Sequence, residues 1–137
     1  MREHPTPDLD SALVLGMAST AIPFARSREE EAERWLRILR LHGEAGAVLQ
    51  ALGVSEAPLE GPSVHDEEER PAGAQDVVAR VADAAALAAE RRQGHCFTTV
   101  DVLLAVIDVY GDDFNQVLRS HGTDRQEVLE RLHPLAA

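Results

Sequence analysis

The chain has 137 residues and a formal net charge of −11, with 45% apolar but only 4% aromatic residues. This length fits one domain with a core of its own, built mainly from aliphatic side chains. Such an acidic chain repels phosphate backbones and anionic lipid headgroups, which argues against nucleic acids and membranes as partners. No apolar stretch approaches the roughly 20 residues that a membrane-spanning helix needs.

Two helices are predicted in the first 43 residues. Thr6 to Asp8 predicts a helix start, with Thr6 as the N-cap, proline at the first helical position and an acid in the first turn. Pro23 is expected to end this helix. Ser27 to Glu30 forms a capping box that opens a second helix, and His42-Gly43 stops it.

A third, short helix is predicted from Ala45 to Leu52, with Gly53 as its end. The segment from Ser55 to Ala74 is rich in proline and glycine and carries the acidic run Asp66 to Glu69. It is predicted to be a solvated linker. A docking tail for a basic partner is the alternative.

The second half begins with a strongly amphipathic pattern from Gln75 to Arg92, which predicts a long helix terminated by Gly94. Thr98 to Asp101 then offers another capped helix start. The residues that follow, up to Val109, are apolar nearly all round, which predicts a buried helix.

Two shorter helices complete the chain. Gly111 to Asp113 is expected to break the buried helix and start a short one, which Gly122 closes. Asp124 is predicted to cap a last helix that Pro134 ends.

The two halves follow the same order of elements, and they agree best where Val48 to Ser55 aligns with Val117 to Asp124. In both segments a helix is followed by glycine and then by a capping residue. Glycine fits there because the residue after a helix often takes a positive φ. The pattern predicts an all-α fold made of two copies of a four-helix unit.

The segment from Gly94 to Leu104, Gly-His-Cys-Phe-Thr-Thr-Val-Asp-Val-Leu-Leu, resembles the motif of the Clp N-terminal (Clp repeat) domain family. The resemblance covers about residues 6–133. It implies two pseudo-symmetric four-helix repeats in one domain, the first at about 6–60 and the second at about 74–133. An acidic linker at about 61–73 would join them.

The resemblance also implies a function. No Gly-x-x-x-x-Gly-Lys-Ser/Thr motif occurs, and the chain contains no lysine, so it carries no ATPase site of that type. The expected function is therefore a non-catalytic, cytoplasmic binding module. It would act as an adaptor for a Clp ATPase and protease, or as a decoy that sequesters Clp-targeting peptides. The expected ligands are peptide substrates or cyclic peptides.

By the same resemblance, the ligand-binding candidates are the aromatic residues and acids near the junction of the two repeats. They are Phe24, Glu33, Trp35, Phe97 and Asp101. Core packing is the alternative role for the aromatic residues. In the family, paired glutamates resemble acidic anchors for phosphoarginine. Here Glu33 is present but Val100 occupies the second position, so the resemblance does not carry this specificity over.

Two other functions compete with the binding module. The neighbours His95 and Cys96 could serve a small enzyme, although adjacent side chains rarely face each other and no third group is evident. His95 is instead expected at a turn, and Cys96 as a small buried residue. No cofactor is expected and, since the six histidines are scattered, no metal. The other competitor is a regulatory interaction domain with a partner unrelated to Clp.

Overall fold

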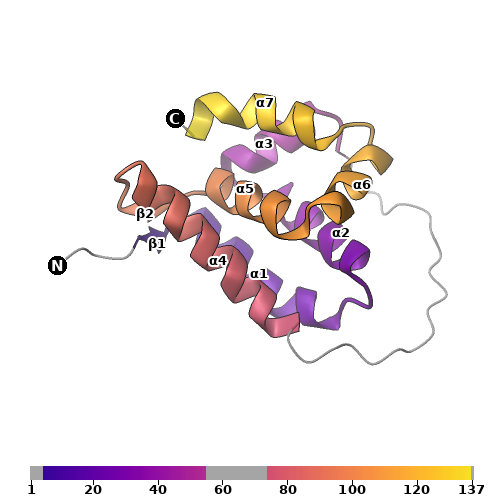
Figure 1. Cartoon of the computed structure of the whole chain (residues 1–137), viewed down its shortest axis with the longest axis horizontal. Coiled ribbons are helices and arrows are strands. Elements are labelled where there is room, and N and C mark those ends of the chain that lie inside the picture. Colours follow the sequence, from indigo (N-terminus) through magenta and orange to yellow (C-terminus); the bar gives the residue numbers. More distant parts are fainter. Residues whose placement is uncertain (1–4, 55–73, 137) are drawn as a thin grey trace.

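Glycine, proline and capping residues divide most of the chain into helices where the sequence predicts them. A computed structural model describes residues 5–54 and 74–136, and the predicted linker at 61–73 lies outside this description. The elements in chain order are β1 (Thr6–Pro7), α1 (Leu9–Ala21), the 3-10 turn η1 (Ile22–Phe24), α2 (Arg28–Leu39), α3 (Gly43–Ala51), α4 (Ala74–Arg91), β2 (Cys96–Phe97), α5 (Thr99–Tyr110), α6 (Asp112–Ser120) and α7 (Arg125–Ala136) (Figure 1). The structure is mainly helical, as predicted.

The start of α1 differs from the prediction. Thr6 and Pro7 do not begin the helix but form β1, which pairs in parallel with β2. The backbone N–H of Thr6 donates to the His95 carbonyl at 3.2 Å. Asp8 is the N-cap instead, and its carboxylate accepts from the backbone N–H of Ser11 at 2.8 Å. The prediction failed because the extended segment finds its partner about 90 residues away in sequence, which local capping rules cannot detect.

The predicted starts of α2 and α5 are confirmed, whereas α3 begins at Gly43 and not at Ala45. Ser27 caps α2 and accepts from the backbone N–H of Glu30 at 3.0 Å, while the Glu30 carboxylate accepts from the N–H of Arg26. Thr98 caps α5 and donates its backbone N–H to Asp101 at 2.9 Å. Asp101 binds the backbone donor of the N-cap residue itself, as in a capping box, whereas Glu30 binds the N–H of the residue before the N-cap.

The two aligned glycines adopt nearly the same conformation. Gly53 has a φ of 92° and Gly122 a φ of 89°. After each glycine, the next residue donates its N–H to the carbonyl five positions earlier, from Val54 to Leu49 and from Thr123 to Leu118, at 3.0 and 3.1 Å. This is the predicted glycine stop, and it occurs in both halves.

Two predicted helix ends are wrong. Gln93, and not Gly94, takes the positive φ of 61° after α4, and Gly94 then donates its N–H to the Ala89 carbonyl at 2.8 Å. Helix α7 continues through Pro134 to Ala136. A proline so close to the end removes only one backbone hydrogen bond from an exposed last turn, so it does not have to stop the helix.

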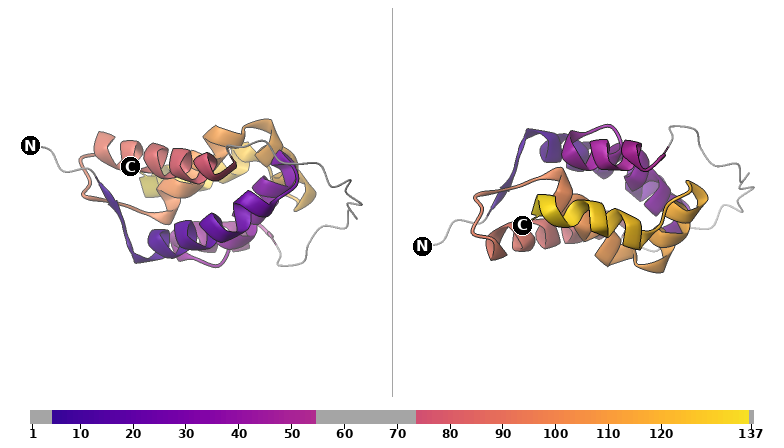
Figure 2. Two further views of the ribbon diagram at one scale, coloured as in Figure 1. Left: turned by 90° about the horizontal axis from the view of Figure 1, so that it is seen from below. Right: turned by 90° about the horizontal axis from the view of Figure 1, so that it is seen from above.

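The helices of the two halves form two sides of the molecule. Figure 2 shows α1–α3 on one side and α4–α7 on the other. The contacts between the sides are reciprocal, because α2 packs on α6 while α3 packs on α5, and α1 packs on α4.

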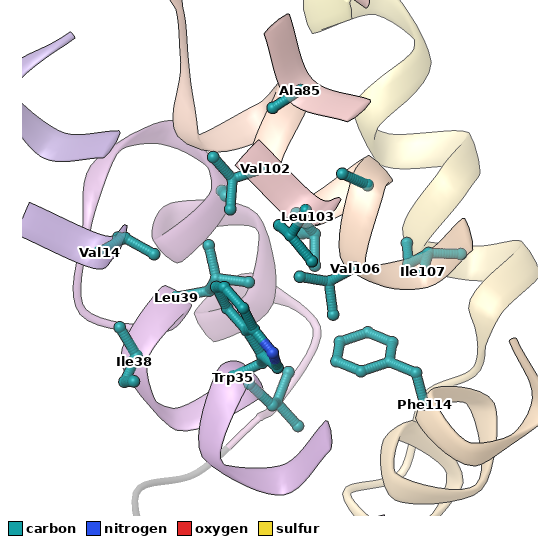
Figure 3. Close-up of a cluster of buried hydrophobic side chains, with 14 of the residues drawn as sticks. Val14, Trp35, Ile38, Leu39, Ala85, Val102, Leu103, Val106, Ile107 and Phe114 are labelled. Carbon is teal, nitrogen blue, oxygen red and sulfur yellow. The ribbon is translucent and has the colours of Figure 1, made fainter. Parts of the chain in front are cut away.

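Helix α5 lies at the centre and is buried over most of its surface, as its apolar sequence predicts. It packs against α4, α2, α3 and α7. Figure 3 shows Leu103, Val106 and Ile107 of this helix among Trp35 and Leu39 of α2 and Phe114 of α6. One core therefore joins the two halves.

Two glycine substitutions should change stability in opposite directions. Gly122→Ala places a Cβ at a positive φ and should lower the free energy of unfolding by about 1–2 kcal/mol. Gly16→Ala, inside α1 with open space around the added Cβ, should raise it by about 0.5–1 kcal/mol. Urea denaturation followed by circular dichroism measures both. Equal effects of the two changes would contradict the left-handed stop.

Candidate functional site

The outward face of α1 is apolar and exposed. Leu9, Leu13 and Met17 follow one another at a spacing of four residues and are 77%, 48% and 43% exposed. The opposite face buries Val14 and Ala18. A surface helix normally carries charged residues outside, so an apolar outer face is typical of a contact surface.

Charge is absent from this stretch of the chain. Residues 11–25 contain no charged side chain. The hydroxyls of Ser19 and Thr20 donate to carbonyls of their own helix, those of Leu15 and Met17, both at 2.9 Å. The two hydroxyls of this part of α1 are therefore bonded to their own helix, and the exposed Asp10 is the charged residue of α1.

This face continues into a groove between the end of α1 and the second half of α2. The groove has a volume of about 370 Å³ and is lined by Met17, Ala21, Arg34, Arg37, Ile38, Arg40 and Leu41. Its apolar residues come from both helices, and Leu41 is 56% exposed. Its charged residues are all arginines. We call the outer face of α1 together with this groove the α1–α2 surface.

Two of the three arginines are fixed by the fold. Arg34 donates to the carbonyl of Ala21 at 2.6 Å and to the Glu30 carboxylate at 2.9 Å. It thereby holds the end of α1 against α2 and satisfies a carbonyl that the helix end leaves open. Arg40 donates to the carbonyl of Val54 at 2.9 Å, which ties the end of α3 to α2.

Arg37 is the third arginine of the groove, and it is exposed. No hydrogen bond or ion pair holds its guanidinium to another residue within 5–54 or 74–136. A guanidinium offers five donors in a planar fork that suits carboxylates and phosphates. Arg37 therefore presents unused donors beside the apolar residues of the groove.

The five residues that the resemblance singled out do not form one surface. Phe24, in η1, is 74% exposed and is the only one of them that lies open to solvent. Trp35 and Phe97 are 0% and 3% exposed, so the alternative role of core packing applies to both. Neither is accessible to a ligand in this structure.

Trp35 belongs to a buried polar chain that connects α2 to α5. Its indole N–H donates to the Tyr110 hydroxyl at 3.0 Å, and this hydroxyl donates to the Glu31 carboxylate at 2.7 Å. The guanidinium of Arg28 lies 5.0 Å from the centre of the Tyr110 ring and pairs with Asp113 at 2.9 Å. Burial and the hydrogen bond to Glu31 raise the pKa of Tyr110, although Arg28 lowers it.

The two acidic candidates are engaged separately. Glu33 on α2 faces the ring Nε2 of His121, which lies 3.2 Å from both carboxylate oxygens. Asp101 on α5 is 1% exposed and forms a bidentate pair with Arg92, one bond of which measures 2.6 Å. The hydrogen bond to Asp101 raises the pKa of Arg92, with burial acting against it. These pairs hold helices together, and the structure does not bring the two carboxylates into one clamp.

His95 and Cys96 lie at the turn before α5. Both are exposed, so the expectation that Cys96 is buried is wrong. The short strand explains this, because successive side chains of a strand point to opposite faces and Phe97 takes the inward position. His95 contributes its backbone carbonyl to the pairing with β1.

No group of three or more His, Cys, Asp or Glu side chains is placed to hold a metal ion within 5–54 and 74–136. None of the helices in these ranges is both long and apolar enough to cross a membrane.

Comparison of the chain with protein-family models, with curated proteins and with solved structures gives no significant match. The α1–α2 surface is therefore interpreted from its own geometry and chemistry.

The sequence analysis missed most of this surface. Two signals were available: Leu9, Leu13 and Met17 form a second apolar stripe beside the buried one, and three arginines follow at a spacing of three along α2. Periodicity could not show which of the two apolar faces of α1 is buried.

Tyr110→Phe should lower the free energy of unfolding by about 1–3 kcal/mol, because it leaves the indole N–H of Trp35 without an acceptor and removes a donor from Glu31. The aromatic ring keeps its shape, so the loss reports on the hydrogen bonds. Guanidinium denaturation followed by the fluorescence of Trp35, the only tryptophan, measures it. A loss below about 0.5 kcal/mol would show that this polar chain contributes little.

The Tyr110 hydroxyl should lose its proton at a higher pH than an ordinary tyrosine. Tyr110 is the only tyrosine, so tyrosinate absorbance reports on it alone. Its folded-state pKa is raised above the unfolded-state value of about 10. Its contribution to stability is therefore complete below about pH 10 and declines as the pH rises further. Native protein should develop tyrosinate absorbance at a higher pH than protein unfolded in urea, and coincident titrations would contradict the buried hydrogen bond.

Proposed function

We propose that this protein is a non-catalytic protein- or peptide-binding module that resembles the N-domain of Clp ATPases. In this proposal it consists of two pseudo-symmetric repeats and works in the cytoplasm. It acts either as an adaptor for Clp proteolysis or as a decoy that sequesters Clp-targeting peptides.

The reciprocal packing of the two halves supports the repeat part of the proposal. If the first half took the place of the second, the contact of α2 with α6 would become the contact of α5 with α3. Both contacts are present in the structure. The nearly equal φ values of Gly53 and Gly122 support the same correspondence, because each ends the third helix of its half.

The α1–α2 surface is the observation that carries the binding function. Its residues Leu9, Leu13, Met17 and Leu41 are between 43% and 77% exposed; the first three lie on α1, and Leu41 lies in the turn after α2. A rigid helical surface needs little ordering when a partner binds, so more of the contact energy appears as affinity. The adjoining groove offers a concave site for an apolar side chain of the partner.

The purified chain should bind either a hexameric ClpC-type ATPase or a cyclic-peptide antibiotic that targets Clp ATPases, with micromolar affinity. Biolayer interferometry with the immobilised chain measures both. Binding of the ATPase identifies an adaptor, and binding of the cyclic peptide without the ATPase identifies a decoy. If neither binds at micromolar concentration, the proposal is wrong, and a regulatory domain with an unrelated partner replaces it.

A pair of leucine variants tests whether the α1–α2 surface makes this contact. Leu13→Glu should weaken binding at least about tenfold, since it places a charge on the apolar face. Leu129→Glu on α7 is the control, because Leu129 is also exposed, at 38%, but lies on another helix. Equal loss in both variants would place the contact elsewhere.

A further inference from the structure

The charge of the α1–α2 surface differs from that of the whole chain. The net charge is −11, yet the segment from Arg34 to Leu41 contains three arginines and no acid. All three line the groove next to Met17, Ala21, Ile38 and Leu41. The groove part of the surface is thus lined by arginines and apolar residues on an acidic molecule, although Arg34 is paired with Glu30 and the exposed Asp10 lies at the other end of α1.

We infer that the α1–α2 surface binds an acidic amphipathic helix of a partner protein, with Arg37 as the contact for a partner carboxylate. This inference deepens the proposed function, because it names the chemistry of the partner that the same surface takes. Charge complementarity decides the occupant. Arg34 already pairs with Glu30. An acidic helix supplies a carboxylate for Arg37, whereas a basic or neutral helix would leave this guanidinium without a counter-charge.

The hydrogen bonds of the three arginines single out Arg37 as the contact for a partner carboxylate. Arg34 and Arg40 already donate to the carbonyls of Ala21 and Val54, so their positions are fixed by the fold. Arg37 is exposed and has none of its donors engaged by the described residues. Arg37 lines the same groove as Leu41, which lies in the turn after α2, so it could pair with a carboxylate while the partner's apolar residues cover the leucine.

The shape of the surface favours a helix as the binding element. Leu9, Leu13 and Met17 form a straight stripe about 12 Å long on α1. A partner helix laid against such a stripe presents apolar side chains at spacings of three and four residues. Gly16, which has open space around its Cβ position, lies beside the stripe and leaves room for close approach.

Three synthetic peptides test the inference on the full chain. They share leucines at positions i, i+3, i+4 and i+7 and carry glutamate, glutamine or arginine at the remaining positions. In fluorescence anisotropy the glutamate peptide should bind, the glutamine peptide at least about tenfold more weakly, and the arginine peptide not at all. Equal binding of the glutamate and glutamine peptides, or no binding of any peptide, would overturn the inference.

Matched arginine variants assign the contact. Arg37→Glu should weaken binding of the glutamate peptide about tenfold or more, and Arg37→Gln by less. Arg119→Glu on α6 is the control, because Arg119 is also exposed and makes the same change in net charge. The difference between the two glutamate variants should shrink at high salt, which screens the local charge pair. If Arg37→Glu and Arg119→Glu weakened binding equally, the change in net charge alone would explain the loss, and the inference would be overturned.

Two further measurements distinguish an acidic partner helix from two other occupants of the α1–α2 surface, a membrane and a second copy of the chain. Binding to phosphatidylserine vesicles that is lost in Arg37→Glu, without peptide binding, would assign the surface to a membrane. A dimer in sedimentation velocity that Arg37→Glu dissociates would assign it to a second copy of the chain. Either result overturns the inference. The three synthetic peptides contain no Clp component, so they can bind even if the Clp ATPase and the cyclic peptide do not. Failure of the proposed Clp-related function and failure of this inference can therefore be told apart.

Discussion

Helix α5 has to be covered on nearly every side, and this requirement shapes the rest of the structure. Residues from Val100 to Ile107 are almost all apolar, so leaving any face of the helix in water would cost free energy in proportion to the exposed area. Helices from both halves of the chain supply the cover, with α4 and α7 from its own half and α2 and α3 from the other. Neither half can bury its apolar surface alone, and the two halves therefore share one core.

Several polar groups inside this core are satisfied by contacts between helices, although the buried hydroxyl of Ser11 on α1 has no hydrogen-bond partner among the described residues. The indole of Trp35, the hydroxyl of Tyr110 and the carboxylate of Glu31 form one chain of hydrogen bonds between α2 and α5. The pair of Arg92 and Asp101 joins the loop after α4 to the start of α5. Buried polar groups without partners would be strongly destabilising, so these contacts also select one arrangement of the helices. Residues that looked suited to ligand binding in the sequence are thereby used within the fold.

Helix α1 covers the core from one side and has no helix on its other side among the described residues. Its inner residues Val14 and Ala18 are buried, while Leu9 and Leu13 remain exposed although they are equally apolar. Arg34 ties the end of this helix to α2 and fixes the groove between them. The α1–α2 surface is therefore a product of the packing. Within the described residues the guanidinium of Arg37 has no bonded partner, which adds a positive charge to the apolar character of this surface.

Local sequence signals predicted the helical fold well. Ser27, Thr98 and Gly122 each act within four residues of themselves, so the boundaries that depend on them could be predicted. Predictions that depended on distant partners did less well. Thr6 looked like a helix cap but pairs with β2, and Cys96 looked buried but points outward from the same strand pair. The five candidate site residues also depend on distant partners: Trp35 and Phe97 are buried, and Glu33 and Asp101 each face a side chain from another part of the chain.

The sequence by itself determined which segments are helical, where most of them begin and end, and that the molecule carries no lysine and a strong negative charge. These properties follow from residue type and from interactions within one or two turns. Only the tertiary structure decided which of two apolar faces of α1 meets solvent, which arginine of the groove has no bonded partner among the described residues, and which aromatic residues are buried. Each of these depends on which surfaces are covered by another helix. Such coverage exists only in the packed molecule and cannot be deduced from any single segment.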